Sequence, residues 1–142
     1  ATVSGLDGQK MSKSYGNTIP IFLEGKALKK RVMAIETDAT PVEAPKDPDR
    51  CNLFALFSLF ASPERIQEVR SLYVNGGAAY GYLKLELLEM ISETFAEARQ
   101  KKAQFMADPA QLRAILRQGG EKAREKAAVT LDLVRDRVGL KY

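Results

Sequence analysis

Apolar side chains recur every three or four positions along most of the chain after residue 24. Leu28, Val32 and Ile35 have this spacing, which predicts an amphipathic helix over residues 25–36. Residues 52–61 are almost wholly apolar, as in a helix that lies at the centre of a bundle. Both segments are therefore expected to bury their apolar side chains against other helices.

Capping residues and glycines set the limits of the other predicted helices. Ser62-Pro63-Glu64 begins a helix that ends at Asn75-Gly76-Gly77, and a long helix follows over residues 81–106. Asp108-Pro109 begins another helix, Gly119-Gly120 interrupts it, and a last helix covers residues 121–138. The positions expected to face inward are Ile66, Val69, Leu72, Tyr73, Leu83, Leu87, Met90, Ile91 (or Leu88), Phe95, Ala98, Leu112, Ile115, Leu116, Ala123, Ala127, Thr130, Leu131 and Val134.

The predicted fold is all-α. A polar loop over residues 1–18, rich in Gly, Ser, Asp and Asn, precedes a bundle of five or six helices over residues 19–142. Strand signals are nearly absent, and the proline-rich stretch over residues 37–50 is expected to be a loop or linker. The chain is thus divided into a flexible loop, 1–18, and a helical domain, 19–142.

Composition is that of a globular protein and excludes several kinds of chemistry. The 142 residues are 45% hydrophobic and 28% charged, with a net charge of +4. The absence of histidine excludes a histidine base, triad or metal ligand in this chain, and the one cysteine, Cys51, permits no internal disulfide or Cys-cluster zinc site. We expect Cys51 to be a small buried residue and no metal site to be present. No apolar run approaches the ~20 residues of a membrane helix and no signal peptide is apparent, so the expected compartment is the cytoplasm, with no membrane partner.

Positive charge is concentrated in two segments. Residues 1–31 hold six basic and two acidic side chains, residues 95–126 hold eight basic and four acidic side chains, and the remainder is net acidic. Such segments are either solvated helix faces or surfaces that face an anion.

One short segment combines residues suited to phosphate binding. Residues 8–17 read Gly-Gln-Lys-Met-Ser-Lys-Ser-Tyr-Gly-Asn. If this loop curls, the ammonium groups of Lys10 and Lys13 reach one anion, and the hydroxyls of Ser12 and Ser14 add donors. Such a loop would clamp a polyphosphate and neutralise the charge that grows on a leaving group. The alternative is a disordered tail that contains lysines.

The literal sequence of this segment points to a family. Lys10-Met11-Ser12-Lys13-Ser14, the KMSKS sequence, resembles the signature loop of class I aminoacyl-tRNA synthetases. The surrounding segments are similar to those of bacterial tryptophanyl-tRNA synthetases: Gly5-Leu6-Asp7-Gly8, Tyr15-Gly16-Asn17, Pro45-Lys46-Asp47-Pro48-Asp49, Cys51-Asn52-Leu53-Phe54 and Tyr80-Gly81-Tyr82-Leu83-Lys84. The resemblance covers the chain from the loop to Tyr142.

This resemblance implies the C-terminal part of an aminoacyl-tRNA ligase of protein biosynthesis. Such an enzyme joins L-tryptophan to tRNA(Trp) with ATP through a tryptophanyl-adenylate, and Mg²⁺ is expected to accompany the nucleotide. Lys10 and Lys13 would be catalytic, and the ATP-binding loop would consist of Lys10, Met11, Ser12, Lys13 and Ser14. The Rossmann catalytic domain, its two-histidine motif and the tryptophan pocket would lie outside this chain. The chain is therefore expected to be inactive by itself, and the parent enzyme to be a homodimer through that missing domain.

The same resemblance implies that the helical domain approaches the tRNA anticodon. The candidate phosphate contacts are Lys101, Lys102, Arg113 and Arg117. They are alternatively solubilising charges that pair at helical spacing with Glu97, Glu121 and Glu125. Three tyrosines are either base-stacking groups or part of the core: Tyr73, Tyr80 and Tyr82.

Three other interpretations stay open at this point. A tyrosyl-tRNA synthetase shares the signature loop and a helical C-terminal region, although residues 45–49 and 80–84 favour the tryptophan enzyme. The chain could also be a stand-alone helical RNA-binding module, or a structural fragment that binds neither ATP nor RNA.

Overall fold

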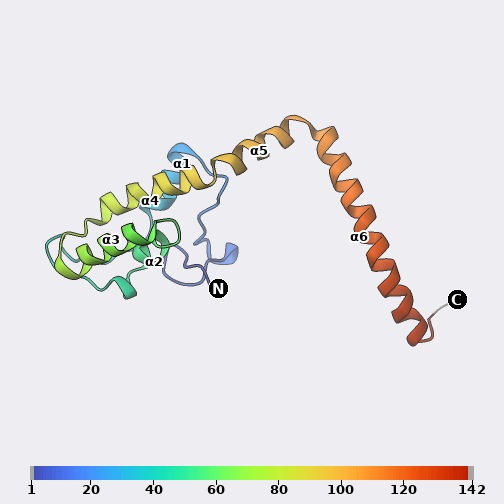
Figure 1. The fold of residues 1–142 in the computed structure, drawn as a ribbon, viewed down its shortest axis with the longest axis horizontal. Coiled ribbons are helices and arrows are strands. Elements are labelled where there is room, and N and C mark those ends of the chain that lie inside the picture. Colours follow the sequence, from blue (N-terminus) through green and yellow to red (C-terminus); the bar gives the residue numbers. More distant parts are fainter. Residues whose placement is uncertain (1, 141–142) are drawn as a thin grey trace. The chain divides into compact units, whose positions relative to one another are not determined.

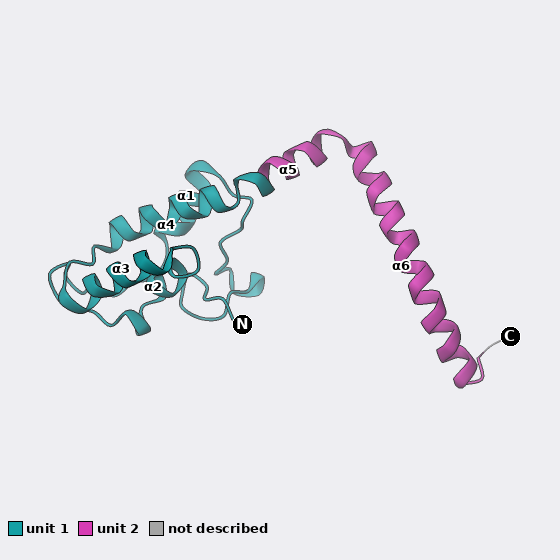
Figure 2. Ribbon diagram, in the orientation of Figure 1, with its two compact units in different colours: residues 1–98 teal, residues 99–142 magenta. Residues whose placement is uncertain are grey.

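The computed structural model describes residues 2–140, whose regular elements are helices (Figure 1). The α-helices are α1 (Gly25–Met33), α2 (Asn52–Phe57), α3 (Pro63–Asn75), α4 (Tyr80–Thr94), α5 (Ala96–Ala107) and α6 (Pro109–Arg137). Two short 3-10 helices lie in the loops, η1 (Lys13–Tyr15) and η2 (Pro48–Arg50). The predicted all-α class and helix number are confirmed for this part of the chain. The chain divides into two compact units, residues 1–98 and 99–142 (Figure 2), whereas the functional division after residue 18 stays a prediction.

Helices α1 to α4 bury one apolar core in the first unit. Both α1 and α2 pack against α4. The core includes Leu28 and Val32 from α1, Leu53 and Phe57 from α2, Val69 and Tyr73 from α3, and Leu83 and Leu87 from α4. Burial of one side chain of this size contributes about 1.5–3 kcal/mol to the stability of the fold. The packed helices therefore hold the ends of the polar loops in place.

A buried lysine ties the end of α1 to α4. Lys84 is 9% exposed, and its Nζ donates hydrogen bonds to the carbonyl oxygens of Ile35 (2.7 Å) and Met33 (3.2 Å). Carbonyl groups at or just after a helix C-terminus lack hydrogen-bond donors within the helix. The Lys84 ammonium is the donor for two such carbonyl groups. Loss of hydration on burial lowers the pKa of Lys84 below the ordinary lysine value.

The loop over residues 37–50 folds around a second buried lysine. Lys46 is 8% exposed, and its Nζ donates hydrogen bonds to the carbonyl oxygens of Pro41 (2.6 Å), Val42 and Ala44 (both 3.3 Å). The ammonium also lies 5.3 Å from the ring centroid of Tyr80. The predicted loop is therefore held against α4 by a cation from its own sequence.

The helix between residues 81 and 106 is interrupted, contrary to the prediction. Phe95 leaves the helical conformation, with φ −102° and ψ 8°, and so separates α4 from α5. Its ring packs edge-on against Phe60 at a centroid distance of 6.2 Å. The apolar run over residues 52–61 is also helical only as far as Phe57, and Leu59 is 57% exposed.

The predicted interruption at Gly119 and Gly120 is wrong, since α6 continues through both residues. Neither glycine has a positive φ, and a β-carbon at either position would meet open space. A helical glycine costs only about 1 kcal/mol relative to alanine. The strong helix formers that follow, over residues 121–123, offset that cost.

The inward positions predicted for residues 112–134 are wrong for the second unit. Helix α6 has no buried residue. It does begin where predicted, because the carboxylate of Asp108 accepts hydrogen bonds from the Ala110 and Gln111 amides (3.1 and 3.0 Å). Leu112 is half-buried, and the apolar positions beyond it are exposed, as at Leu116 (65%). An apolar stripe is buried only where another element packs on it, and no described residue of α6 is buried within its own unit. Within residues 2–140, no helix combines the length and apolar character needed to span a membrane.

We expect the double substitution Gly119→Ala/Gly120→Ala to stabilise α6 by about 1 kcal/mol per site, because both positions are helical and open to solvent. Far-UV circular dichroism should show a higher melting temperature for the helical signal. The control Gly16→Ala should lower stability, since Gly16 has φ 67°. An unchanged or lower melting temperature in the double variant would contradict a continuous α6.

Candidate functional site

Residues 3–17 form a loop that folds back on itself. Ser4 and Lys10 form an isolated antiparallel bridge, and the Met11 amide donates a hydrogen bond to the Val3 carbonyl oxygen (2.8 Å). The loop then enters η1, which is capped at its C-terminal end by Gly16 with a left-handed φ of 67°. The five residues of the predicted ATP-binding loop therefore lie on one curved segment.

The charged side chains of this segment are accessible. Lys10 and Lys13 are exposed, and neither ammonium forms a hydrogen bond or ion pair with any residue in the described range 2–140. The hydroxyls of Ser12 and Ser14 lie 2.8 Å apart and hydrogen-bond to each other. An anion that approaches this segment would meet two cations and two hydroxyl groups that adjust by rotation.

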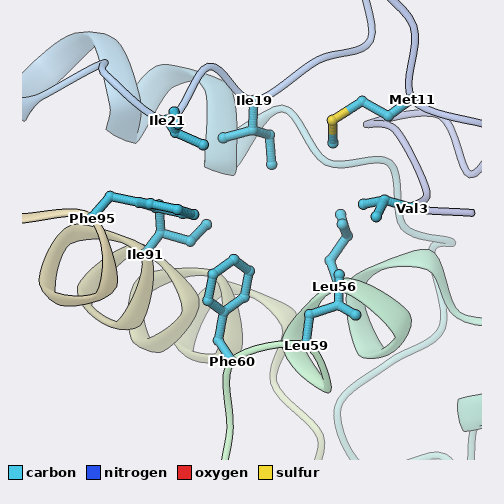
Figure 3. A pocket seen from close by; sticks show the side chains of 9 residues that line it. All are labelled: Val3, Met11, Ile19, Ile21, Leu56, Leu59, Phe60, Ile91 and Phe95. Carbon is cyan, nitrogen blue, oxygen red and sulfur yellow. The ribbon is translucent and has the colours of Figure 1, made fainter. Parts of the chain in front are cut away.

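Met11 lies between these polar residues but contributes to an apolar pocket (Figure 3). The pocket has a volume of about 250 Å³ and lies beside the ends of α2 and α4. Its lining side chains are Val3, Met11, Ile19, Ile21, Leu56, Leu59, Phe60, Ile91 and Phe95. The methionine of the loop thus faces an apolar pocket, while its lysines remain exposed to solvent.

The side chain of Asn17 is buried and hydrogen-bonds to three residues of the loop. It is 4% exposed, its Oδ1 accepts a hydrogen bond from the Ser12 amide (2.8 Å), and its Nδ2 donates to Asp7 Oδ1 (2.8 Å) and the Lys10 carbonyl oxygen (3.2 Å). The bond from Asn17 is the main cause that lowers the pKa of the Asp7 carboxyl group, because it favours the ionised form. Sequence reasoning assigned neither residue a role, although both belong to the segments that carry the family resemblance.

The base of the loop is bonded to the helical unit. Asn52 Nδ2 donates hydrogen bonds to the carbonyl oxygens of Gly5 and Leu6 (both 2.9 Å), and the Glu36 amide also donates to Leu6 (2.8 Å). Gly5 has no room for a side chain, because a β-carbon there would occupy the space of the Asn17 amide. These contacts fix the start of the loop relative to α1 and α2.

The predicted RNA contacts belong to the other unit. Lys101 and Lys102 are exposed on α5, and Arg113 and Arg117 are exposed on α6, where Arg117 Nε lies 4.0 Å from Glu121 Oε1. An exposed pair of this kind contributes little to stability and leaves the guanidinium accessible. The structure therefore groups these four cations in residues 99–142 and the KMSKS loop in residues 1–98.

The three tyrosines considered for base stacking have different environments. Tyr73 is fully buried and its hydroxyl lies 3.3 Å from Sγ of the half-buried Cys51, so it cannot stack on a base. The Tyr80 hydroxyl donates a hydrogen bond to Asp38 Oδ1 (2.9 Å), and burial raises the pKa of Tyr80. Tyr82 is 78% exposed and is the accessible ring of the three.

Sequence comparison gives relatives over almost the whole chain. The tryptophan–tRNA ligase of Rhodopirellula baltica is 45% identical over 141 residues, which are 99% of this chain and 44% of that protein. The tryptophan–tRNA ligase of Campylobacter jejuni is 41% identical over 140 residues, again 99% of this chain and 44% of that protein. The crystal structure of the Campylobacter jejuni enzyme, a complex with ADP and tryptophan, matches with a TM-score of 0.85 over 99% of this chain and 44% of that chain.

The chain belongs to the tryptophan–tRNA ligase family. It corresponds to the C-terminal part of these ligases and spans about 44% of the length of the relatives it matches. No protein-family model matches the chain. The tyrosyl-tRNA synthetase alternative is not favoured, because the relatives are tryptophan–tRNA ligases.

We expect Gly5→Ala to loosen the loop of this ligase family member, because the new β-carbon displaces the Asn17 amide. Trypsin should then cleave after Lys10 and Lys13 faster than in the unsubstituted chain, as followed by mass spectrometry. Gly81→Ala is the matched control, since a β-carbon at this helical position meets open space. Equal cleavage rates in all three proteins would contradict the hydrogen-bonded loop.

Proposed function

We propose that this chain supplies the phosphate-binding loop and the helical C-terminal part of a tryptophan–tRNA ligase that joins L-tryptophan to tRNA(Trp) with ATP. The main support is the curved loop that presents Lys10 and Lys13 to solvent, in a chain 41–45% identical to tryptophan–tRNA ligases. The tryptophan pocket and the rest of the nucleotide site would lie in the part of the enzyme outside this chain.

The proposed reaction has two steps. The tryptophan carboxylate attacks the α-phosphorus of ATP, the bond to the bridging oxygen breaks, and pyrophosphate leaves with the electron pair. The tryptophanyl group then passes from the adenylate to a terminal ribose hydroxyl of the tRNA, and AMP leaves. Magnesium accompanies ATP as part of the substrate, bound by the phosphate oxygens.

Lys10 and Lys13 would act electrostatically in the first step. Negative charge accumulates on pyrophosphate as it leaves, and two ammonium groups on one curved loop neutralise it. Ser12 and Ser14 would donate hydrogen bonds after exchanging their mutual contact (2.8 Å) for phosphate oxygens. No covalent bond between protein and substrate is needed, because the loop contributes charge and position.

The second unit would bind the tRNA. Lys101, Lys102, Arg113 and Arg117 are exposed there, and cations of this kind contact phosphates without reading sequence. We place the whole enzyme in the cytoplasm, where aminoacylated tRNA is used, and take it to be a homodimer through its catalytic part.

In a complete ligase that contains this chain, Lys13→Ala should lower kcat of tryptophan-dependent ATP–pyrophosphate exchange by about 100- to 1000-fold, because a charged donor aimed at the leaving group is lost. Lys26→Ala is the matched control, an exposed lysine on α1 away from the loop. An unsubstituted ligase without exchange activity, or a Lys13→Ala variant as active as the control, would overturn the proposed function.

The tRNA surface has its own test in the complete ligase. Arg113→Gln/Arg117→Gln should weaken tRNA binding and reduce the slope of log affinity against log salt by about one for each cation removed. Arg135→Gln/Arg137→Gln removes the same charge further along α6 and should leave the slope closer to that of the unsubstituted protein. Equal slopes in both double variants would place the tRNA elsewhere.

A further inference from the structure

Within residues 2–140, Asn17 is the one buried polar side chain that hydrogen-bonds to the KMSKS loop. Among the described residues, the buried polar or charged side chains are Asn17, Lys46 and Lys84. Both lysines bond to carbonyl groups at the ends or loops of the helical core. Asn17 instead directs all three of its side-chain hydrogen bonds at the segment between Asp7 and Ser12.

The bonds of Asn17 bracket one residue of the loop. Its Nδ2 donates to the carbonyl oxygen of Lys10, and its Oδ1 accepts from the amide of Ser12. The two backbone groups lie on either side of Met11, so the amide fixes the direction in which the backbone passes from Lys10 to Ser12. That direction determines where the Lys10 side chain leaves the loop and where η1, which begins at Lys13, starts.

The chemistry of the neighbours fixes the orientation of the amide. The Ser12 amide is a donor and requires an oxygen, whereas the Lys10 carbonyl and the Asp7 carboxylate are acceptors and require an N–H. An aspartate at position 17 could satisfy only Ser12, and it would place a second carboxylate against Asp7. The position therefore requires both the donor and the acceptor of an amide.

Asn17 is itself held in place by the helical unit. Its carbonyl oxygen accepts a hydrogen bond from the Leu6 amide (2.9 Å), and the Leu6 carbonyl is bonded to Asn52 and Glu36. The side chain fills the space above Gly5, where a β-carbon would collide with it. Asn17 therefore links the loop backbone to residues that are bonded to the helical unit.

We propose that Asn17 is a positioning residue for adenylyl transfer, which holds the Lys10–Ser14 loop in the shape that presents its two ammonium groups to the leaving pyrophosphate. This inference rests on the proposed function, since it assumes that the loop binds the phosphates of ATP. Asn17 does not touch the substrate, and it acts through the backbone of Lys10 and Ser12. A misplacement of catalytic groups by about 1 Å can cost about 100-fold in rate, so the effect of losing this amide is expected to be large.

The test uses Asn17→Asp in the complete ligase that contains this chain, with Lys13→Ala and Asn75→Asp as companions. Asn75 is exposed at the end of α3, so its substitution makes the same chemical change away from the loop. We expect Asn17→Asp to lower kcat of ATP–pyrophosphate exchange by about 100-fold while the KM for tryptophan is unchanged. Asn75→Asp should leave both constants unchanged.

A second substitution separates positioning from loss of stability. Asp7→Asn, added to Asn17→Asp, removes the carboxylate pair and restores a donor opposite position 17, so it should recover about tenfold of the lost kcat. A variant that is merely unstable would lose active protein, without a selective change in kcat that a neighbouring substitution repairs. Urea unfolding of the unsubstituted ligase and the four variants measures that stability independently.

A third measurement needs no catalytic activity. In the 142-residue chain, Asn17→Ala should speed hydrogen exchange at the Ser12 amide, whose acceptor is lost, while amides within α4 keep their exchange rates. Exchange at Ser12 that is unchanged would overturn the proposal at its structural step.

The outcomes distinguish this proposal from the function on which it rests. If Lys13→Ala is impaired and Asn17→Asp has normal kcat, the positioning role is wrong and the proposed function stands. If both variants have normal kcat, the proposed function itself fails. Impaired kcat in both variants, with recovery by Asp7→Asn, supports the two together.

Discussion

The hydrogen bond from the Glu36 amide to the Leu6 carbonyl oxygen (2.8 Å) joins the loop to the helices of the first unit. On one side of this joint, the carbonyl of the preceding residue, Ile35, accepts a hydrogen bond from the buried ammonium of Lys84 on α4. On the other side, the Leu6 amide donates to the backbone of Asn17. A continuous series of hydrogen bonds therefore leads from the core helix α4 to the KMSKS loop.

The two units are stabilised by different physical effects. The first unit buries an apolar core among four helices, and its polar loops form hydrogen bonds with two buried lysines and one buried asparagine. The second unit buries no residue of α5 or α6, so its helices depend on local propensity, the cap at Asp108 and exposed ion pairs. A site that needs fixed geometry, such as a phosphate clamp, is built on the first kind of unit. A surface that contacts a long charged partner through separate phosphates tolerates the second kind.

Local sequence signals predicted much of the fold. Ser62 and Pro63 begin α3 where predicted, and the Ser62 hydroxyl accepts the expected hydrogen bond from the Arg65 amide (3.3 Å). The interruption at Phe95 depends on a ring contact with Phe60, more than 30 residues earlier, which periodicity does not report. The glycines of α6 were misjudged because a cost of about 1 kcal/mol each is small beside the sum of good neighbouring propensities.

In the candidate site too, some residues could be predicted from local sequence and others depend on contacts in the folded chain. Lys10 and Lys13 were evident from the letters of the loop, whereas the role of Asn17 arises from the space above Gly5 and from the direction of three hydrogen bonds. Lysines are mostly exposed in proteins, so the burial of Lys46 and Lys84 could not be inferred from residue type.

The burial of Lys46 and Lys84 separates two populations of primary amines in the folded molecule. The other described lysines, such as Lys13 and Lys26, present their amines to solvent and should react readily with an acylating label. Lys46 and Lys84 are enclosed by backbone carbonyls, so their amines become reactive only when the loop over residues 37–50 or the end of α1 opens. The two buried amines are therefore built-in reporters of opening at two separate places in the first unit.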